Sequence, residues 1–517
     1  MREIRVERQI LRDLPRALES EWLVTNGLGG YASSTILGIN TRKYHGLLVA
    51  ALNPPVDRRV LLCKLDEEIV CREDRHALGS NEFQDGIHPQ GYQSITDFKQ
   101  SPFPTFSYSN SEIKLEKTIL MPYGKNATIV TYETSTRCKE PADLWIHPLV
   151  NSRHFHNTTT KDRQRWNLTQ SDPKTISIQS PEPASALVLS SNAGEFEKQE
   201  NWIERVFFRK DSSHGTSCFD DYYTPGKFKV TLEPNSKKSF YIAATTGNSL
   251  DEAEKAHQAL ADELKDVKDL AEREAHRLDN LVQKHSRAVK EPPEAWLEWL
   301  LSATDCFLVD RRSTGTKTVI AGYPWFEDWG RDALISLPGL ALVTERYEQA
   351  KEILLTFQSY CWRGIIPNRF PDQAGNQPIY NAVDATLWYL NSVFQYLNYT
   401  YDFEFIKQRL WATLQSIIDH HQKGTINGIR VDSDGLLCHG PQLTWMDATV
   451  NNTPITPREG KSVEVQALWY NALKIMELLS LHFEDTNLNE KYQALAEKAR
   501  KSFLRKFWRD TQGLADV

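Results

Sequence analysis

The sequence lacks several features that mark familiar protein classes. Its 517 residues contain no Cys-x-x-Cys pair, and the seven cysteines are scattered, so neither a zinc site nor a disulfide framework is indicated. The N-terminus has no apolar leader, and no run of about 18 apolar residues is present that could span a membrane. These absences predict a cytoplasmic protein.

A continuous basic stripe is also missing. Lysine and arginine total 61 against 68 aspartates and glutamates, which gives a net charge of −7. Nucleic acid and an anionic membrane surface are therefore not expected as partners. The glycines of Asn26–Gly30 are not followed by the Lys-Ser/Thr pair of a phosphate-binding loop, so a nucleotide cofactor is not predicted.

Hydrophobic residues, by contrast, make up 40% of the chain and charged residues 25%, as in globular proteins. The length predicts two or three domains. Fourteen tryptophans are many. Large aromatic residues belong in cores, but those beside Asp, Arg and Glu also suit sugar binding, because the C–H face of a pyranose packs well on an aromatic plane.

Residues 1–248 are predicted to form a large β-sandwich. Short alternating or β-branched runs recur there between clusters of Pro, Asn, Gly and Ser. The candidate strands are Lys43–Ala50, Ile113–Leu120, Ala127–Tyr132, Ala186–Leu189, Lys227–Leu232 and Lys238–Thr245. Residues 249–290 are polar with apolar positions at helical spacing, so we expect a helical linker whose first helix is capped by Asp251.

Residues 291–517 are almost wholly helical in pattern. The candidate helices are 294–310, 330–344, 346–361, 383–399, 403–423, 461–482 and 487–508. Paired helices with their loops at one end suggest an α/α barrel, and this number of helices indicates either an incomplete barrel or an open helical array. The expected fold class is thus multidomain α and β. Function tends to lie on the loops of such a scaffold.

The loop segment Phe326–Asp332 runs into a predicted helix. Arg331 offers a fork of donors and Asp332 accepts, which suits a bidentate grip on sugar hydroxyls, with Trp325 and Trp329 as stacking faces. The alternative is an ordinary charged pair at the positive end of a helix.

The segment from Gly364 to Asp384 has the same ambiguity. Asn368 follows Gly364 and Pro367, which suit a helix end and a stop. Asn381 is a good N-cap, and Asp384 falls at the third position after it, so capping explains both residues as well as sugar binding does.

The candidate acid is Asp447, which follows Trp445 in a long loop. Desolvation beside an aromatic face favours the protonated carboxylic acid, as a general acid for glycosidic cleavage requires. Arg458, Lys461 and Glu464 then alternate in sign at a helix start. They either form a solvated salt-bridge face, or Glu464 points into the pocket with Lys461 or Arg458 setting its charge.

Together these segments resemble the glycogen debranching enzyme family, in its amylo-α-1,6-glucosidase part of the stand-alone prokaryotic type. The matching pieces run in the family's order: Glu21–Gly46, Trp329–Asp332, Gly364–Asn368, Thr444–Asp447 and Thr456–Glu464. The resemblance implies an N-terminal β-sandwich and a C-terminal (α/α)6 barrel like that of glucoamylases. It also implies hydrolysis of the α-1,6 branch stubs of glycogen or limit dextrin, which releases glucose without a metal or cofactor.

By that resemblance, Asp447 matches the general acid, Arg331 and Asp332 match the pair that holds the terminal glucose, and other positions match the pocket. The candidate substrate-binding residues are Trp325, Trp329, Arg331, Asp332, Asn368, Asp384, Trp445, Arg458, Lys461 and Glu464.

The family inverts configuration with a second carboxylate near the end of its barrel, and this sequence shows no counterpart. A chain truncated at its C-terminus is therefore expected, with an oligomer or a missing C-terminal piece as partner. Two alternatives stay open. One is a trehalase-like α-glucoside hydrolase, and the other is a catalytically incomplete glucan-binding protein.

Overall fold

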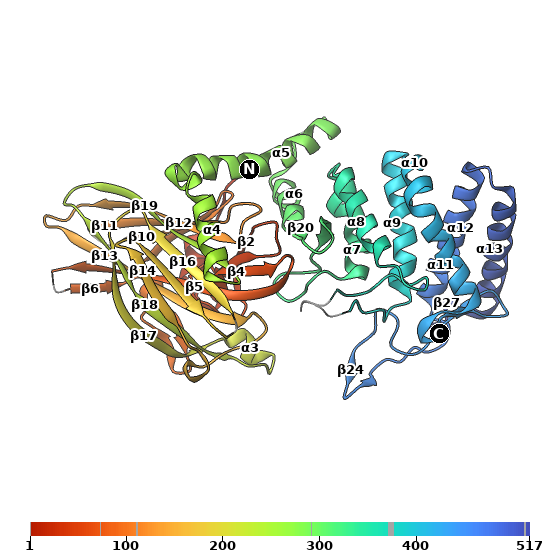
Figure 1. The fold of residues 1–517 in the computed structure, drawn as a ribbon, viewed down its shortest axis with the longest axis horizontal. Coiled ribbons are helices and arrows are strands. Elements are labelled where there is room, and N and C mark those ends of the chain that lie inside the picture. The colour runs from red at the N-terminus through yellow and green to blue at the C-terminus, as the bar shows by residue number, and fades with distance from the viewer. Residues whose placement is uncertain are drawn as a thin grey trace. The chain divides into compact units, whose positions relative to one another are not determined.

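The chain folds into two compact units, Met1–Arg312 and Ser313–Val517 (Figure 1). The computed structural model describes residues 2–72, 74–109, 112–182, 184–290, 292–370, 377–510 and 513–517. Residues 292–312, which the sequence pattern assigns to the helical domain, belong to the first compact unit.

The first unit contains two antiparallel sheets. The strands of the nine-stranded sheet lie in this order: β1 (Ile4–Arg5), β9 (Ile95–Gln100), β10 (Pro104–Ser109), β11 (Ile113–Leu120), β12 (Ala127–Thr136), β19 (Lys237–Gly247), β16 (Ser185–Ser191), β15 (Thr175–Ser180) and β14 (Asn167–Asp172). The strands of the eight-stranded sheet lie in this order: β17 (Glu195–Phe207), β18 (Phe219–Leu232), β13 (Ala142–His154), β5 (Val56–Cys71), β4 (Gly46–Asn53), β3 (Tyr31–Thr35) and β2 (Glu21–Thr25). The eighth strand, β6 (Asp74–Ala77), pairs with β5. The predicted β-sandwich is confirmed.

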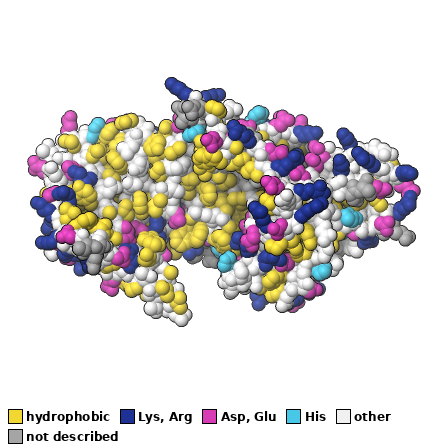
Figure 2. Space-filling model, turned by 180° about the vertical axis from the view of Figure 1, so that it is seen from behind, with side chains coloured by type: hydrophobic (Ala, Val, Ile, Leu, Met, Phe, Trp, Pro, Cys, Tyr) yellow, Lys and Arg dark blue, Asp and Glu magenta, His cyan; other side chains and the backbone are white. Residues whose placement is uncertain are grey.

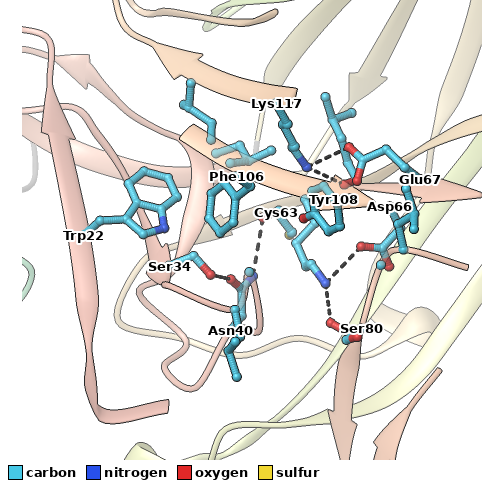
Figure 3. A pocket seen from close by; sticks show the side chains of 18 residues that line it. Trp22, Ser34, Asn40, Cys63, Asp66, Glu67, Ser80, Phe106, Tyr108 and Lys117 are labelled. Carbon is cyan, nitrogen blue, oxygen red and sulfur yellow. Dashed lines mark hydrogen bonds and ion pairs between the residues drawn. The ribbon is translucent and has the colours of Figure 1, made fainter. Parts of the chain in front are cut away.

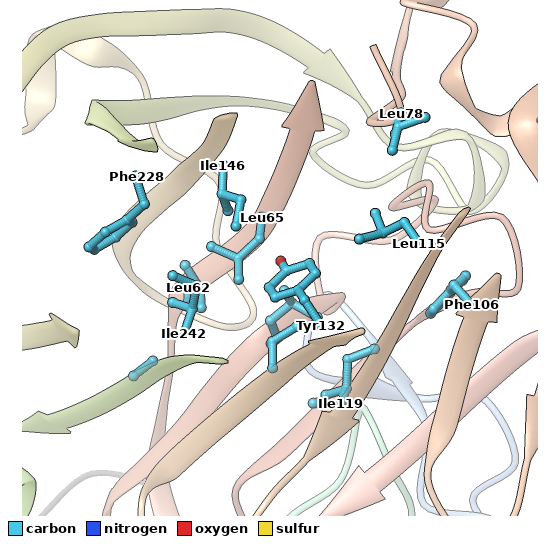
Figure 4. Close-up of a cluster of buried hydrophobic side chains, with 14 of the residues drawn as sticks. Leu62, Leu65, Leu78, Phe106, Leu115, Ile119, Tyr132, Ile146, Phe228 and Ile242 are labelled. Atoms are coloured by element: carbon cyan, nitrogen blue, oxygen red, sulfur yellow. The ribbon is translucent and has the colours of Figure 1, made fainter. Parts of the chain in front are cut away.

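Alternation of side chains explains how these strands pack. In β11, Ile113, Leu115 and Ile119 are buried while Lys114 and Glu116 face solvent, which is the period-two pattern of a strand with one covered face. Figure 4 shows the resulting core between the sheets. One sheet contributes Leu62, Leu65, Ile146 and Phe228, and the other contributes Phe106, Leu115, Ile119, Tyr132 and Ile242.

Charged side chains are also buried between the sheets (Figure 3). Lys117 of β11 forms an ion pair of 2.7 Å with Glu67 of β5 and donates to the carbonyl of Leu65 at 2.9 Å. The hydroxyl of Tyr132 donates to Glu67 at 2.6 Å. A second pair, Lys64 with Asp66 at 2.9 Å, lies beside it. These contacts satisfy charges whose burial would otherwise be costly.

The remaining elements of the first unit are mostly short. Three longer helices follow the sandwich: α4 (Leu250–Leu260), which packs on β16 and β19, α5 (Val267–Val289) and α6 (Ala295–Phe307). The predicted cap is wrong, because Ser249 and not Asp251 accepts the hydrogen bond from the amide of Glu252. The short elements are α1 (Arg8–Arg12), α2 (Leu14–Glu19), β7 (Asn81–Phe83), β8 (Gly86–His88), η1 (Gly91–Ser94), η2 (Lys161–Arg163), α3 (Arg209–Ser213), η3 (Glu263–Lys265) and β20 (Leu308–Arg311).

The second unit is built from helical hairpins. Its helices are α7 (Gly330–Leu337), η4 (Pro338–Leu342), α8 (Tyr347–Ser359), α9 (Asp384–Thr400), α10 (Phe403–Phe405), η5 (Ile406–Leu410), α11 (Trp411–Lys423), α12 (Val463–His482) and α13 (Thr486–Phe507). Short segments between and after them are β21 (Thr316–Val319), η6 (Ile426–Gly428), β22 (Arg430–Val431), β23 (Leu437–Cys438), β24 (Thr449–Val450), β25 (Thr453–Pro454), β26 (Trp508–Arg509) and β27 (Gly513–Leu514).

The connections between these helices alternate in length. Residues 343–346, 401–402 and 483–485 are tight turns, whereas residues 360–370, 377–383 and 424–462 belong to long connections at the opposite end of the hairpins (Figure 1). The N-termini of α7, α9 and α12 therefore point toward the same end as the long loops. This is the paired arrangement expected from the sequence, and the helical prediction is confirmed.

The surface carries charges of both signs. On the face shown in Figure 2, Lys and Arg side chains are interspersed with Asp and Glu, in keeping with the near balance of charges in the sequence. Across the described residues, every helix is too short or too polar to cross a lipid bilayer.

Candidate active site

The candidate site lies where three helices of the second unit begin. Arg331 and Asp332 stand in the first turn of α7, Asp384 is the first residue of α9, and Glu464 stands in the first turn of α12. The positive end of each helix dipole favours carboxylates there. One end of the hairpin array thus gathers one arginine and three carboxylates from distant parts of the sequence.

Arg331 links this group together. Its guanidinium donates to both oxygens of Asp384, at 2.8 and 3.0 Å, which is a bidentate pair. It also donates to a carboxylate oxygen of Asp447 at 3.5 Å and to the carbonyl of Thr444 at 3.2 Å. Arg331 therefore ties the start of α9 to the loop that carries the candidate acid.

Asp384 takes part in this clamp rather than in helix capping. The N-cap of α9 is Val383, and Asp384 stands at the first helical position, so the expected Asn381 cap with Asp384 three residues later is wrong. The side chain of Asp384 is only 3% exposed. Burial raises its pKa above the ordinary value, although the neighbouring Arg331 opposes the shift.

Asp332, next to Arg331 at the start of α7, is exposed. Burial of part of its side chain raises its pKa, and the carboxylates of Asp447 and Asp384 raise it further, while Arg331 lowers it. A carboxyl group in this environment can accept hydrogen bonds from sugar hydroxyls. It also lies within electrostatic reach of the candidate acid.

Asp447 itself lies in the long segment between β23 and α12. Its side chain is 28% exposed, and its carbonyl accepts a hydrogen bond of 3.0 Å from the side chain of Gln442. Trp445, two residues earlier, is 58% exposed. An exposed tryptophan beside a partly exposed carboxyl group suits stacking of a sugar ring near a proton donor.

A second arginine fixes the start of α12. Arg458 pairs with both oxygens of Glu464, one of them at 2.7 Å, and with both oxygens of Asp516, at 3.1 and 2.6 Å. It also approaches the hydroxyl of Thr444 at 3.5 Å. Glu464 is thus held by Arg458. Lys461 instead pairs with Asp432 at 2.6 Å and Asp434 at 2.8 Å, so its charge is used outside this group.

The loop after α8 supports the start of α7. The carbonyl of Asn368 accepts from the amide of Gly330 at 2.8 Å, and the side chain of Asn368 is completely buried. A Cβ on Gly330 would lie 2.2 Å from the carbonyl oxygen of Pro367, so only glycine fits this close approach. Asn368 therefore positions the first turn that carries Arg331.

The tryptophans of the first motif differ in exposure. Trp325 is 38% exposed. Trp329 is the N-cap residue of α7, with Phe326 edge-on at 5.9 Å and the guanidinium of Arg369 at 5.5 Å from its ring. Among the described residues, the indole nitrogen of Trp329 has no hydrogen-bond partner.

The structure gives roles to two residues for which the sequence pattern predicts none. Thr444 accepts from Arg331 through its carbonyl and lies beside Arg458 through its hydroxyl, so it connects the two arginines. Asp516 completes the environment of Arg458. No local motif surrounds Asp516, and only its position in the fold reveals this role.

Two family models match separate parts of the chain. The family model described as "Glycogen debranching enzyme N terminal" matches residues 20–239, and the model described as "Amylo-alpha-1,6-glucosidase" matches residues 302–517. A glycogen debranching enzyme of Saccharomyces cerevisiae is 29% identical, with 31% of this chain and 14% of the yeast chain covered. This chain therefore matches only a small part of that relative's length.

The solved structure of a bacterial glucoamylase shows a likeness in fold. A bacterial glucoamylase complexed with acarbose has a TM-score of 0.56 and 11% sequence identity, covering 97% of this chain and 68% of its own. A putative kojibiose phosphorylase from the human microbiome has a TM-score of 0.49 and 12% identity, covering 95% of this chain and 64% of its own.

Proposed function

The chain belongs to the glycogen debranching enzyme family, and from that premise we propose that it hydrolyses the α-1,6-glucosidic branch stubs of glycogen or limit dextrin and releases glucose. The observation that carries the proposal is the arginine clamp of the second unit. Arg331 joins Asp384 to Asp447 at the loop end of the helical hairpins, beside the exposed Trp445.

In this proposal Asp447 is the general acid. Its carboxyl group donates a proton to the glycosidic oxygen as the bond to the terminal glucose breaks. Arg331 holds the loop of Asp447 in place. Among the described residues, Asp384, Asp447 and Thr444 use four of the five N–H donors of its guanidinium, which leaves one for a sugar hydroxyl.

Asp332 and the exposed tryptophans complete the grip on the sugar. Asp332 accepts hydrogen bonds from hydroxyls of the terminal glucose, and Trp445 and Trp325 offer apolar faces to the ring. Arg458 and Glu464 act less directly, because each uses its charged groups to hold the start of α12 against the loop of Thr444.

An inverting mechanism also needs a second carboxylate, about 6.5–9.5 Å from the acid, to activate a water molecule. Asp384 and Glu464 are poorly suited to that task, since both oxygens of each accept hydrogen bonds from an arginine. This favours a positioning role for both residues and motivates a test of turnover by the chain itself.

The test is glucose release from a malto-oligosaccharide that carries one α-1,6 glucosyl stub. We expect release by the natural chain and a loss of at least about 100-fold in Asp447→Asn. Asp432→Asn is the matched control, because Asp432 pairs with Lys461 outside the site and should leave the rate unchanged. Glucose appearing first as the β-anomer would establish inversion.

The same assay separates the alternatives. Trehalose turnover in place of branch-stub turnover would indicate a trehalase-like enzyme. Binding of the branched substrate without glucose release, in a preparation that melts cooperatively, would contradict hydrolysis and indicate a glucan-binding role. Full activity of Asp447→Asn would remove that residue from the mechanism.

A further inference from the structure

Two cysteines that are distant in sequence meet in the β-sandwich of the first unit. Cys71 is the last residue of β5, and Cys138 follows β12. Glu112, directly before β11, lies beside them. One ligand atom from each of the three residues lies within 4.8 Å of the other two, and the Cys138 thiol approaches a carboxylate oxygen of Glu112 at 3.7 Å.

The three residues lie at or next to the ends of strands from both sheets. β5 belongs to the eight-stranded sheet, and β11 and β12 belong to the nine-stranded sheet. Cys138 is buried, Cys71 is partly buried and Glu112 is exposed. The cluster is therefore rooted in the sandwich core on one side and open to solvent on the other.

The two thiols and the carboxylate determine which metal ions this cluster can bind. Two thiolates favour a soft or borderline metal, and a carboxylate beside them is typical of zinc rather than of copper(I). Tetrahedral zinc with Zn–S bonds of about 2.3 Å places its ligand atoms about 3.8 Å apart. The ligand atoms of Cys71, Glu112 and Cys138 therefore have to move closer together by roughly 1 Å or less to reach that geometry.

We propose that Cys71, Glu112 and Cys138 bind a zinc-class divalent cation, with water as the fourth ligand, and that the bound ion ties the two sheets together. Two thiolates and one carboxylate carry three negative charges against the two positive charges of the ion. Arg72, next to Cys71, forms contacts of 2.7 and 2.6 Å with Glu140, so its positive charge is already paired with that carboxylate.

Cobalt(II) is a suitable probe, because thiolate ligation to it gives a near-ultraviolet charge-transfer band and a tetrahedral field gives strong visible bands. The full chain, reduced and freed of metal by chelation, is titrated with cobalt. We expect one cobalt per chain and its displacement by zinc. Cys71→Ser and Cys138→Ser should abolish the thiolate band, and Glu112→Gln should weaken affinity at least about tenfold.

Cys218→Ser is the matched control, since Cys218 is a partly buried free cysteine of the same unit outside the cluster, and its cobalt spectrum should be unchanged. Zinc should also raise the melting temperature of the natural chain by several degrees but not that of Cys138→Ser, because a ligand of the folded state stabilises it.

The absence of a thiolate band in the natural chain would overturn the proposal, as would the same band in Cys138→Ser. So would a Cys71–Cys138 disulfide in the purified protein that, once reduced, takes up no cobalt. Circular dichroism of each variant separates loss of ligation from loss of folding, and a folded Cys138→Ser chain that still gains stability from zinc contradicts the site.

Discussion

Replacing Asp384 with asparagine tests whether the arginine clamp holds the candidate site together. The side chains of Arg331 and Asp384 are 12% and 3% exposed, and two N–H···O contacts of 2.8 and 3.0 Å join them. Each charge-assisted hydrogen bond contributes about 1.5–3 kcal/mol. Asparagine keeps one acceptor but turns an NH2 group toward the guanidinium in place of the other.

One of the two bonds is therefore lost, together with the charge attraction. We expect the free energy of unfolding of the second unit to fall by about 2–4 kcal/mol. The measurement is urea unfolding at neutral pH, followed by the helical circular dichroism signal. Asp432→Asn is the control, because its ion pair with Lys461 is 42% exposed at the aspartate and solvent screens such surface pairs.

A double-mutant cycle with Arg331→Gln isolates the pair itself. The two replacements together should cost less than the sum of the single ones, because either change alone already removes the interaction. If Asp384→Asn destabilised the chain no more than Asp432→Asn, or if the two clamp variants were strictly additive, the clamp would not hold the site together.

Three further predictions follow from single residues. His421 is fully buried, which lowers its pKa from 6.5 to about 4, so the unfolded state binds more protons between these values and stability should fall as the pH drops from 6.5 toward 4. His421→Leu should flatten that slope in urea titrations across this range, and an unchanged slope would contradict the assignment. Gly330→Ala puts a methyl group 2.2 Å from the Pro367 carbonyl and should cost about 1–3 kcal/mol, whereas Gly339→Ala, with open space around it, should not lower the melting temperature. Trp445 is 58% exposed, so Trp445→Ala should change the free energy of unfolding by less than about 1 kcal/mol but raise KM for the branched substrate. Trp469 is 0% exposed, so Trp469→Ala should lower the free energy of unfolding by about 3–5 kcal/mol. An unchanged KM in Trp445→Ala would count against stacking.

The sequence predicts the elements of this fold well because periodicity is a local property. The alternation in Ile113–Leu120 specifies a strand with those bounds, and the 3.6-residue spacing after position 461 specifies α12 to within two residues of its start. Helix caps are less secure, because several polar residues near a helix start can satisfy the same amides. This is why Ser249 caps α4 in place of Asp251.

The pairing of charges across the fold is not available from the sequence in the same way. The motif containing Arg458, Lys461 and Glu464 shows alternating charge, but the pattern does not say which cation meets Glu464. In the structure Arg458 forms an ion pair with Glu464, and Lys461 forms one with Asp432. Likewise, Cys71 and Cys138 show no metal-binding spacing, and the pairing of β strands alone brings them together.

The ion pair between the sheets of the first unit restricts how this sandwich can evolve. Lys117 and Glu67 belong to opposite sheets, and Tyr132 donates to the same carboxylate. Losing one partner leaves a buried charge and costs about 3–5 kcal/mol, whereas replacing the whole group with apolar residues of similar volume is often neutral or stabilising by about 1–4 kcal/mol. Stepwise substitution from the charged interface to an apolar one therefore passes through unstable single mutants. Selection that accepts one substitution at a time will keep the charges, while a simultaneous replacement of all three residues can reach the apolar interface directly.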